Sequence, residues 1–143
     1  MSKPNAKIPI LLVLGSLALG VWAYWLWLRP VNVEILEGVV LRSRPLILAI
    51  SKYEQDRGVP PPDLKALVPR YLSRIPAPGL NSAAAYSYEA GNSIPGGRDN
   101  PWMLWVGVDN DSRLIYLPLQ NYRPDRPYEY QRVGDWDLEI APD

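Results

Sequence analysis

The chain has 143 residues, with 15 basic and 15 acidic side chains and therefore no formal net charge, and it contains neither histidine nor cysteine. Their absence excludes disulfides, zinc sites that use either residue, and catalytic triads that depend on either side chain. Beyond the first 28 residues the 15 acidic groups face 13 basic ones, a charge of about −2, so no basic patch argues for nucleic-acid binding.

The N-terminal part is dominated by an uncharged apolar run of 21 residues, 8–28. As a helix rising about 1.5 Å per residue it would reach about 31 Å, which matches a hydrocarbon core of about 30 Å. Trp22, Trp25 and Trp27 gather near the C-terminal end of the run, as an interfacial aromatic belt does. The sequence therefore predicts one transmembrane helix in contact with the lipid bilayer.

The basic side chains before this run favour a cytoplasmic N-terminus, because Lys3 and Lys7 have no acidic neighbour there. We therefore expect a single-pass protein of the inner cell membrane. Its cytoplasmic tail would cover 1–7 and its extracytoplasmic domain 29–143.

Two other interpretations of the run stay open. A secretory signal peptide cleaved after Ala18-Leu19-Gly20 is one, although cleavage there would leave a new N-terminus that is itself apolar. The other keeps the membrane anchor and gives it a second role in self-association. Ser16 and Gly20 are small residues four positions apart, a spacing that lets two membrane helices pack closely, so self-association through this helix is a hypothesis.

Apolar residues recur at three- and four-residue steps over 33–57, which predicts an amphipathic helix. Pro45 lacks the N–H that would bond back to Leu41, so a kink or break is expected there, and Ser43 could cap a second segment. Gly58 is expected to end the helix. A proline-rich but apolar stretch follows, and it predicts a packed connection with one or two helical turns over 63–68.

The second half of the chain changes from helical to alternating periodicity, which predicts strands. Turn residues at 109–112 join two of them into a β-hairpin over 102–118. The predicted fold class is α+β: an N-terminal transmembrane helix that continues into a kinked amphipathic helix packed on a small antiparallel sheet. The expected strands cover 84–90, 102–108, 113–119, 128–133 and 135–140.

A helix that ends in a tyrosine is followed by a glycine-proline turn, a leucine-rich short segment, and then tyrosine and proline before the sheet. These features lie at Ile50–Tyr53, Gly58-Val59-Pro60, Leu64–Pro69, Arg70-Tyr71-Leu72 and Ile75-Pro76. Their order resembles that of type IV pilins and pseudopilins, most closely the major pseudopilin of type II secretion. The resemblance implies a structural or adaptor protein with a protein partner in the cell envelope, near a secretion or pilus apparatus. The predicted span contains no acid to match the assembly glutamate of that family, and its glycines do not fit the usual leader, so a permanently anchored pilin-like domain is expected.

Three aspartates offer the oxygen ligands that calcium prefers. Asp109 and Asp111 flank Asn110 in the predicted turn, and the loop before the hairpin could bring Asp99 close to them. The resemblance adds weight to this site, since type II pseudopilins bind calcium near the sheet. The alternative is a plain hairpin turn without a metal, and then no cofactor is needed.

The segment NYRPDRPYEYQR, 121–132, combines tyrosine and arginine, two residues that are favoured at interface hot spots. The sequence predicts a partner-binding surface there. The alternative is a surface connection whose tyrosines lie over the sheet edge. The predicted partner-binding residues are Tyr122, Arg123, Arg126, Tyr128 and Tyr130.

Acidic and apolar residues alternate in the last predicted strand, which places Asp135, Asp137 and Glu139 on one face and Trp136 on the other. A solvated acidic face over a core tryptophan is expected, and a hydrolase that uses Asp135 and Asp137 is the weaker alternative. The favoured function is a non-enzymatic structural or adaptor protein. The second hypothesis is a membrane-tethered module that binds a ligand of the envelope.

Overall fold

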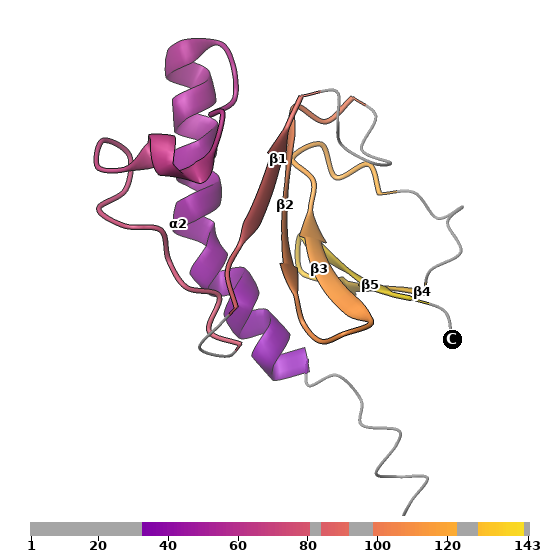
Figure 1. The fold of residues 1–143 in the computed structure, drawn as a ribbon. Helices are drawn as coiled ribbons and strands as arrows, with labels where there is room; N and C mark the ends of the chain where they lie inside the picture. The colour runs from indigo at the N-terminus through magenta and orange to yellow at the C-terminus, as the bar shows by residue number, and fades with distance from the viewer. Residues whose placement is uncertain (1–32, 81–83, 92–98, 123–128, 142–143) are drawn as a thin grey trace, which may run out of the picture. The chain divides into compact units, whose positions relative to one another are not determined.

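The computed structural model describes residues 33–80, 84–91, 99–122 and 129–141. Within this part, one long helix, α2, packs against a five-stranded antiparallel sheet, and a short 3₁₀ helix, η1, lies between them in sequence (Figure 1). The helices are α2 (Val33–Arg57) and η1 (Leu64–Leu67), and the strands are β1 (Ser87–Ala90), β2 (Trp102–Gly107), β3 (Ser112–Tyr116), β4 (Glu129–Val133) and β5 (Trp136–Ile140).

The predicted membrane helix requires a correction. No helix in the described ranges is long and apolar enough to cross a bilayer. The predicted fold class is therefore wrong in including a transmembrane helix that continues into α2, and the inner-membrane localisation that depended on it is unsupported. The one long helix that is described, α2, does not qualify as a span because it carries charged side chains along much of its length. The predicted tail 1–7 and span 8–28, with Trp22, Trp25 and Trp27, lie outside the described residues.

Helix α2 occupies the range expected from its periodicity, and its buried residues recur at three- and four-residue steps. The expected break is absent, because the helix continues through Pro45. The hydroxyl of Ser43 donates to the carbonyl of Val40, 2.7 Å away, inside the helix, so Ser43 does not cap a second segment. Gly58 ends the helix as predicted, with a φ of 74°. The buried residues are Leu36, Val39, Ser43, Leu46, Ala49 and Ile50.

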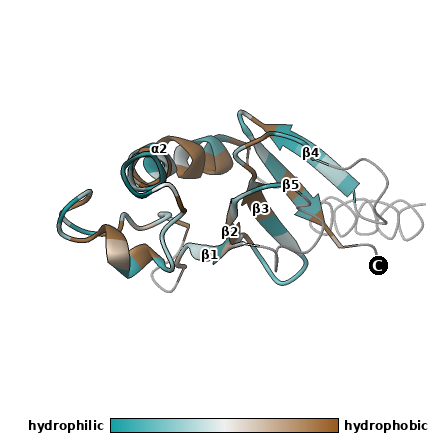
Figure 2. Ribbon diagram, turned by 90° about the horizontal axis from the view of Figure 1, so that it is seen from above, coloured by the Kyte–Doolittle hydropathy of each residue, from teal (hydrophilic) through white to brown (hydrophobic). Residues whose placement is uncertain are grey.

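The strand order is β1-β2-β3-β5-β4, and every neighbouring pair is antiparallel. The predicted hairpin is confirmed as β2 and β3, with Val106 opposite Leu114. Strand β5 pairs with both β3 and β4, so β4 forms an edge. That edge strand is mostly hydrophilic (Figure 2), as suits a strand with one side open to solvent.

Aromatic rings form a continuous row on the side of the sheet that faces α2. Neighbouring ring centroids in the row lie 5.5–6.4 Å apart. Two hydrogen bonds connect this row to the helix: the indole N–H of Trp102 donates to Glu54 at 3.2 Å, and the hydroxyl of Tyr86 donates to the carbonyl of Val39 at 3.3 Å. The row runs through Tyr88, Trp102, Tyr116, Trp136 and Tyr86. Trp136 is 1% exposed, which confirms its predicted place in the core.

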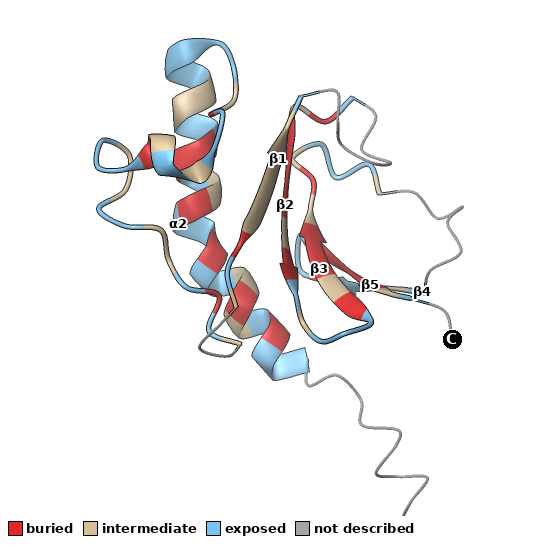
Figure 3. Ribbon diagram, in the orientation of Figure 1, coloured by how far each residue is buried: buried red, intermediate tan, exposed pale blue. Residues whose placement is uncertain are grey.

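The proline-rich connection after α2 is packed, as expected from its apolar residues, and Leu67 in η1 is fully buried. Asp63 caps η1 by accepting a hydrogen bond from the N–H of Ala66 at 3.0 Å. The guanidinium of Arg42 donates to the carbonyl of Pro78 at 2.6 Å and holds the end of the connection against α2. Figure 3 shows the resulting pattern, in which buried segments of α2, the connection and the sheet face one another.

Candidate functional site

The sheet has a second face, opposite α2, on which cross-strand pairing places aromatic, basic and acidic side chains in two rows. Residues directly opposite in an antiparallel pair share a face, so the register fixes each row. One row contains Trp105, Ile115, Asp137 and Arg132, and the next contains Gly107, Arg113, Glu139 and Tyr130. We call this the outer sheet face.

Two ion pairs on the outer sheet face join residues that are direct cross-strand neighbours. Arg113 contacts Glu139 at 2.5 Å, and Arg132 contacts Asp137 at 3.2 Å. The acids are buried, with Glu139 2% and Asp137 7% exposed, whereas the side chains of Arg113 and Arg132 keep 41% and 47% of their surface exposed. The predicted solvated acidic face is therefore wrong for these two acids, because the arginines opposite them cover and neutralise them.

Each arginine also lies over an aromatic ring. The guanidinium carbon of Arg132 is 4.3 Å from the ring centroid of Tyr122, and that of Arg113 is 5.9 Å from the ring centroid of Trp105. Arg132 in addition donates to the side chain of Gln120 at 2.8 Å. Cation–π and ion-pair contacts thus hold both guanidinium groups in place while part of each stays open to solvent.

The hydroxyl of Tyr122 both accepts and donates a hydrogen bond. It accepts from the N–H of Leu117 at 3.0 Å and lies 2.8 Å from the carbonyl of Asp135, to which it donates. Burial raises the pKa of the Tyr122 hydroxyl well above its ordinary value, and the bond from Leu117 offsets only part of that effect. The ring of Tyr122 packs with Trp105 against a small apolar cluster of Met103, Ile115 and Leu117.

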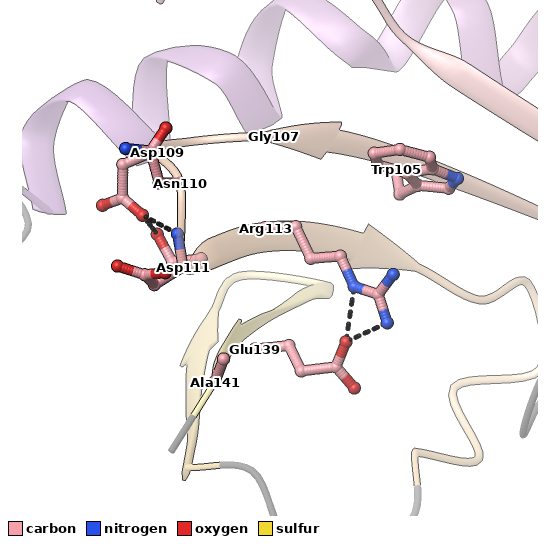
Figure 4. A pocket seen from close by; sticks show the side chains of 9 residues that line it. Trp105, Gly107, Asp109, Asn110, Asp111, Arg113, Glu139 and Ala141 are labelled. Atoms are coloured by element: carbon pink, nitrogen blue, oxygen red, sulfur yellow. Dashed lines mark hydrogen bonds and ion pairs between the residues drawn. The ribbon is translucent and has the colours of Figure 1, made fainter. Parts of the chain in front are cut away.

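A hollow of about 280 Å³ opens on the outer sheet face beside the β2–β3 turn. Figure 4 shows Trp105 at one end of this hollow and the 109–111 turn at the other, with Gly107 between them and the guanidinium of Arg113 directed at Glu139. A side chain added to Gly107 would meet no atom within 4 Å, so the glycine leaves this stretch of β2 open. The hollow combines an indole face, a cation and three carboxylates.

The three aspartates predicted to bind calcium do not form one cluster. One carboxylate oxygen of Asp109 accepts from the N–H of Asp111 at 3.0 Å and from the hydroxyl of Ser112 at 2.7 Å, as in an ordinary Asx turn. Burial acts to raise the pKa of Asp109, but these hydrogen bonds outweigh it and lower the pKa. Asp99 precedes β2, at the opposite end of that strand from Asp109. In the part of the chain that the structure describes, no group of three or more acidic residues could hold a metal ion.

The structure describes two of the five predicted partner-binding residues, and both belong to the outer sheet face. Tyr122 is held as described above, and the hydroxyl of Tyr130 donates to Glu139 at 3.4 Å. Arg123, Arg126 and Tyr128 lie outside the described residues.

The two carboxylates considered for a hydrolase have different environments. Asp137 is buried in its ion pair with Arg132, and Asp135 is exposed in the turn between β4 and β5. Because Asp137 is engaged with a cation directly opposite and Asp135 lies outside the strand, the pair does not share a catalytic arrangement.

Sequence reasoning did not identify Trp105 and Arg113 as parts of this site, and it placed Arg132 in the predicted partner-binding segment 121–132 without naming it among the five binding residues. Residues 102–106 are uniformly apolar, so the sequence has no alternation of polar and apolar residues there to show what the second face of the strand does. Trp105, which lies on that second face, was therefore given no role. The arginines become significant only once the register places them opposite Glu139 and Asp137. A search for arginines in one predicted strand and acids at alternate positions in another could have suggested such pairs.

The chain matches no protein-family model, no curated protein and no solved structure. Its resemblance to the pseudopilins therefore stays a prediction from the sequence.

Proposed function

We propose that this domain is a structural or adaptor module that binds a protein partner through its outer sheet face. The observation that carries the proposal is the composition and order of that face. Trp105, Tyr122 and Tyr130 are interleaved with two arginines that are already fixed by acids and rings.

This composition suits a protein interface for two reasons. Tryptophan, tyrosine and arginine contribute most of the binding free energy at characterised interfaces. Side chains that are ordered before binding lose less conformational entropy when the complex forms. Arg113 and Arg132 meet both conditions, since each is held by an ion pair and a ring and is still about two-fifths to one-half exposed.

The resemblance to type IV pilins and the major pseudopilin suggests the kind of partner. An adaptor with such a fold would associate with a component of a secretion or pilus apparatus. The helix-on-sheet architecture is consistent with this proposal, but it does not select this family over other α+β proteins.

The test is site-specific photo-crosslinking of the full chain in the cells that produce it. A benzophenone amino acid replaces Trp105, at the edge of the hollow, and Val59 serves as the control because it is 60% exposed and lies beyond the end of α2. We expect a discrete crosslinked protein from position 105 and at least about fivefold less of it from position 59. Equal yields from the two positions, or no product from position 105, would refute the proposal.

The second candidate function, a ligand-binding module, is favoured by the hollow itself. A small molecule could stack on Trp105 and bond to the side chains around Arg113. Under this alternative a small ligand would change the tryptophan fluorescence of the natural chain but not that of a Trp105→Phe variant, and the photo-crosslinker would capture no protein.

A further inference from the structure

Helix α2 presents apolar side chains on the side opposite its buried stripe. Leu41 is 56% and Leu48 is 68% exposed, and Pro45 is exposed between them. Leu41 and Leu48 are seven residues apart, close to two helical turns, so they lie one above the other with Pro45 alongside. We call these three residues the α2 ridge. It lies away from the sheet and is separate from the surface used by the proposed adaptor function.

The surroundings of Leu48 can accept a second helix. Two shallow hollows border it, of about 480 Å³ and about 530 Å³. The larger is lined by α2 alone, and the other lies between α2 and the connection at Tyr71 and Leu72. A projecting side chain beside shallow depressions is compatible with helix packing, in which ridges enter grooves.

The charges along α2 favour a second copy of the same helix, running in the opposite direction, as the occupant of the ridge, because a two-fold axis can be placed so that Glu37 and Lys52 meet across it. The exposed Arg44 lies beside its own copy at that axis and turns its long side chain to solvent. We place a two-fold axis between Arg44 and Pro45. Leu41 lies three positions before Arg44 and Leu48 three positions after Pro45, so each faces the other residue in the second copy. In the same way, Glu37 lies seven positions before Arg44 and Lys52 seven positions after Pro45, so Glu37 of one copy faces Lys52 of the other. An isologous interface needs this self-complementarity, in which each residue meets a different residue of the second copy.

Lys52 is available for such a pair. It contacts Asp56 at 2.9 Å within its own helix, but its side chain is 59% exposed. An exposed ion pair of this kind contributes little to stability and can be exchanged. We infer that the α2 ridge binds a second copy of this chain, antiparallel, with two Leu41–Leu48 contacts at the centre and two Glu37–Lys52 pairs outside them.

The first test uses the natural absence of cysteine. Full-length Leu41→Cys and Leu48→Cys variants are prepared in a mild detergent that keeps the apolar run 8–28 in solution, and they are oxidised separately and as an equal mixture. We expect a disulfide-linked dimer from the mixture, at least about fivefold above either variant alone, because only the mixture places two thiols opposite each other. Leu41→Cys mixed with Val59→Cys is the matched control, since Val59 is similarly exposed but lies beyond the helix.

The second test reverses the charges. Glu37→Lys alone and Lys52→Glu alone should each raise the dimer dissociation constant, measured by analytical ultracentrifugation, by at least about threefold, because each places like charges opposite one another. The double variant, Glu37→Lys with Lys52→Glu, places opposite charges across the interface again and should return the dissociation constant to near the original value.

Three outcomes would overturn the inference. One is a chain that stays monomeric at high concentration. Another is a dimer that gives no more crosslink from the Leu41→Cys and Leu48→Cys mixture than from the control, which would place its contacts elsewhere, for example in 8–28. The third is a double charge variant as weak as the single ones. Photo-crosslinking from Trp105 is unaffected by any of these results, so the two proposals fail independently.

Discussion

At the scale of single residues, the outer sheet face depends on charged groups that neutralise one another. Glu139 is 2% exposed, and a carboxylate so buried is tolerated only with a partner, here Arg113 at 2.5 Å and the hydroxyl of Tyr130 at 3.4 Å. Cross-strand register supplies the arginine directly, so the burial of the acid and the placement of the base have the same cause. The pair therefore acts as a fixed structural unit of the proposed interface.

We predict that Arg113→Met lowers the free energy of unfolding by about 1–3 kcal/mol. Removing one partner of a buried pair usually costs about 3–5 kcal/mol, but Arg113 is 41% exposed and solvent screening reduces its contribution. The double variant Arg113→Met with Glu139→Met removes the stranded charge as well and should recover at least half of the loss. Urea unfolding of both variants checks this, and a double variant less stable than the single one would show that the stranded carboxylate is not the cause.

At the scale of elements, the fold depends on how the connection after α2 is attached to the helix. Gly79 has a φ of 79°, a conformation that favours glycine, and a side chain there would come within 2.6 Å of the guanidinium nitrogen of Arg42. That same guanidinium donates to the carbonyl of Pro78. The glycine therefore permits both the turn and the close approach of the arginine that attaches the connection.

We predict that Gly79→Ala lowers the free energy of unfolding by about 2–4 kcal/mol, through backbone strain and loss of the Arg42 hydrogen bond. Gly91→Ala is the matched control: its φ is 83°, but nothing lies within 4 Å of the added carbon, so only the strain of about 1–2 kcal/mol is expected. In an Arg42→Ala background the difference between the two substitutions should largely disappear. Thermal unfolding of the two glycine variants, and of the same two substitutions in the Arg42→Ala background, measures this difference. Equal losses of stability from Gly79→Ala and Gly91→Ala in the natural background would exclude Arg42 as the cause.

At the scale of the whole molecule, the chain uses tyrosine and tryptophan where many domains use phenylalanine, which it lacks. Folding buries tyrosine hydroxyls on both faces of the sheet. Burial raises the pKa of Tyr86 to about 12, and it also raises the pKa values of Tyr88, Tyr116 and Tyr122. The stability of the folded chain is consequently linked to alkaline pH.

The sign of that linkage follows from the raised values. A tyrosine whose pKa is higher in the folded state than its ordinary 10.0 stabilises the fold fully below about pH 10 and loses that contribution as the pH rises through the folded value. We predict that the free energy of unfolding falls steeply between about pH 10 and pH 12. Tyr86→Phe should lessen the fall by roughly 2–3 kcal/mol, since one pKa unit corresponds to about 1.4 kcal/mol.

Urea unfolding at several pH values, with tyrosine ionisation followed by absorbance, makes this measurement. A slope that is the same for Tyr86→Phe and the natural chain would contradict the assigned burial of that hydroxyl. Near pH 7 the variant should lose only about 1 kcal/mol, the value of its hydrogen bond to Val39.

The sequence by itself determined the local structure of the described part. Periodicity located α2 and the β2–β3 hairpin, Gly58 marked the end of the helix, and the alternation around Trp136 placed it in the core, because these features depend on neighbours close in sequence. Of the kink or break expected at Pro45, the break is absent, since packing of the buried stripe against the sheet compensates for one missing hydrogen bond. No helix in the described ranges can cross a membrane, so the predicted anchor finds no support there, and the run 8–28 on which it was based lies outside those ranges.

Only the tertiary structure decided the candidate site. Which acid meets which arginine depends on the register of β3, β5 and β4, and the placement of β5 between the other two strands is not encoded in any local pattern. That register buried Glu139 and Asp137, and the pairing of β2 with β3 brought Trp105 beside Arg113. Side chains remote in sequence acquire their electrostatic environment from strand pairing, so the chemistry of this surface could not be derived from residue order alone.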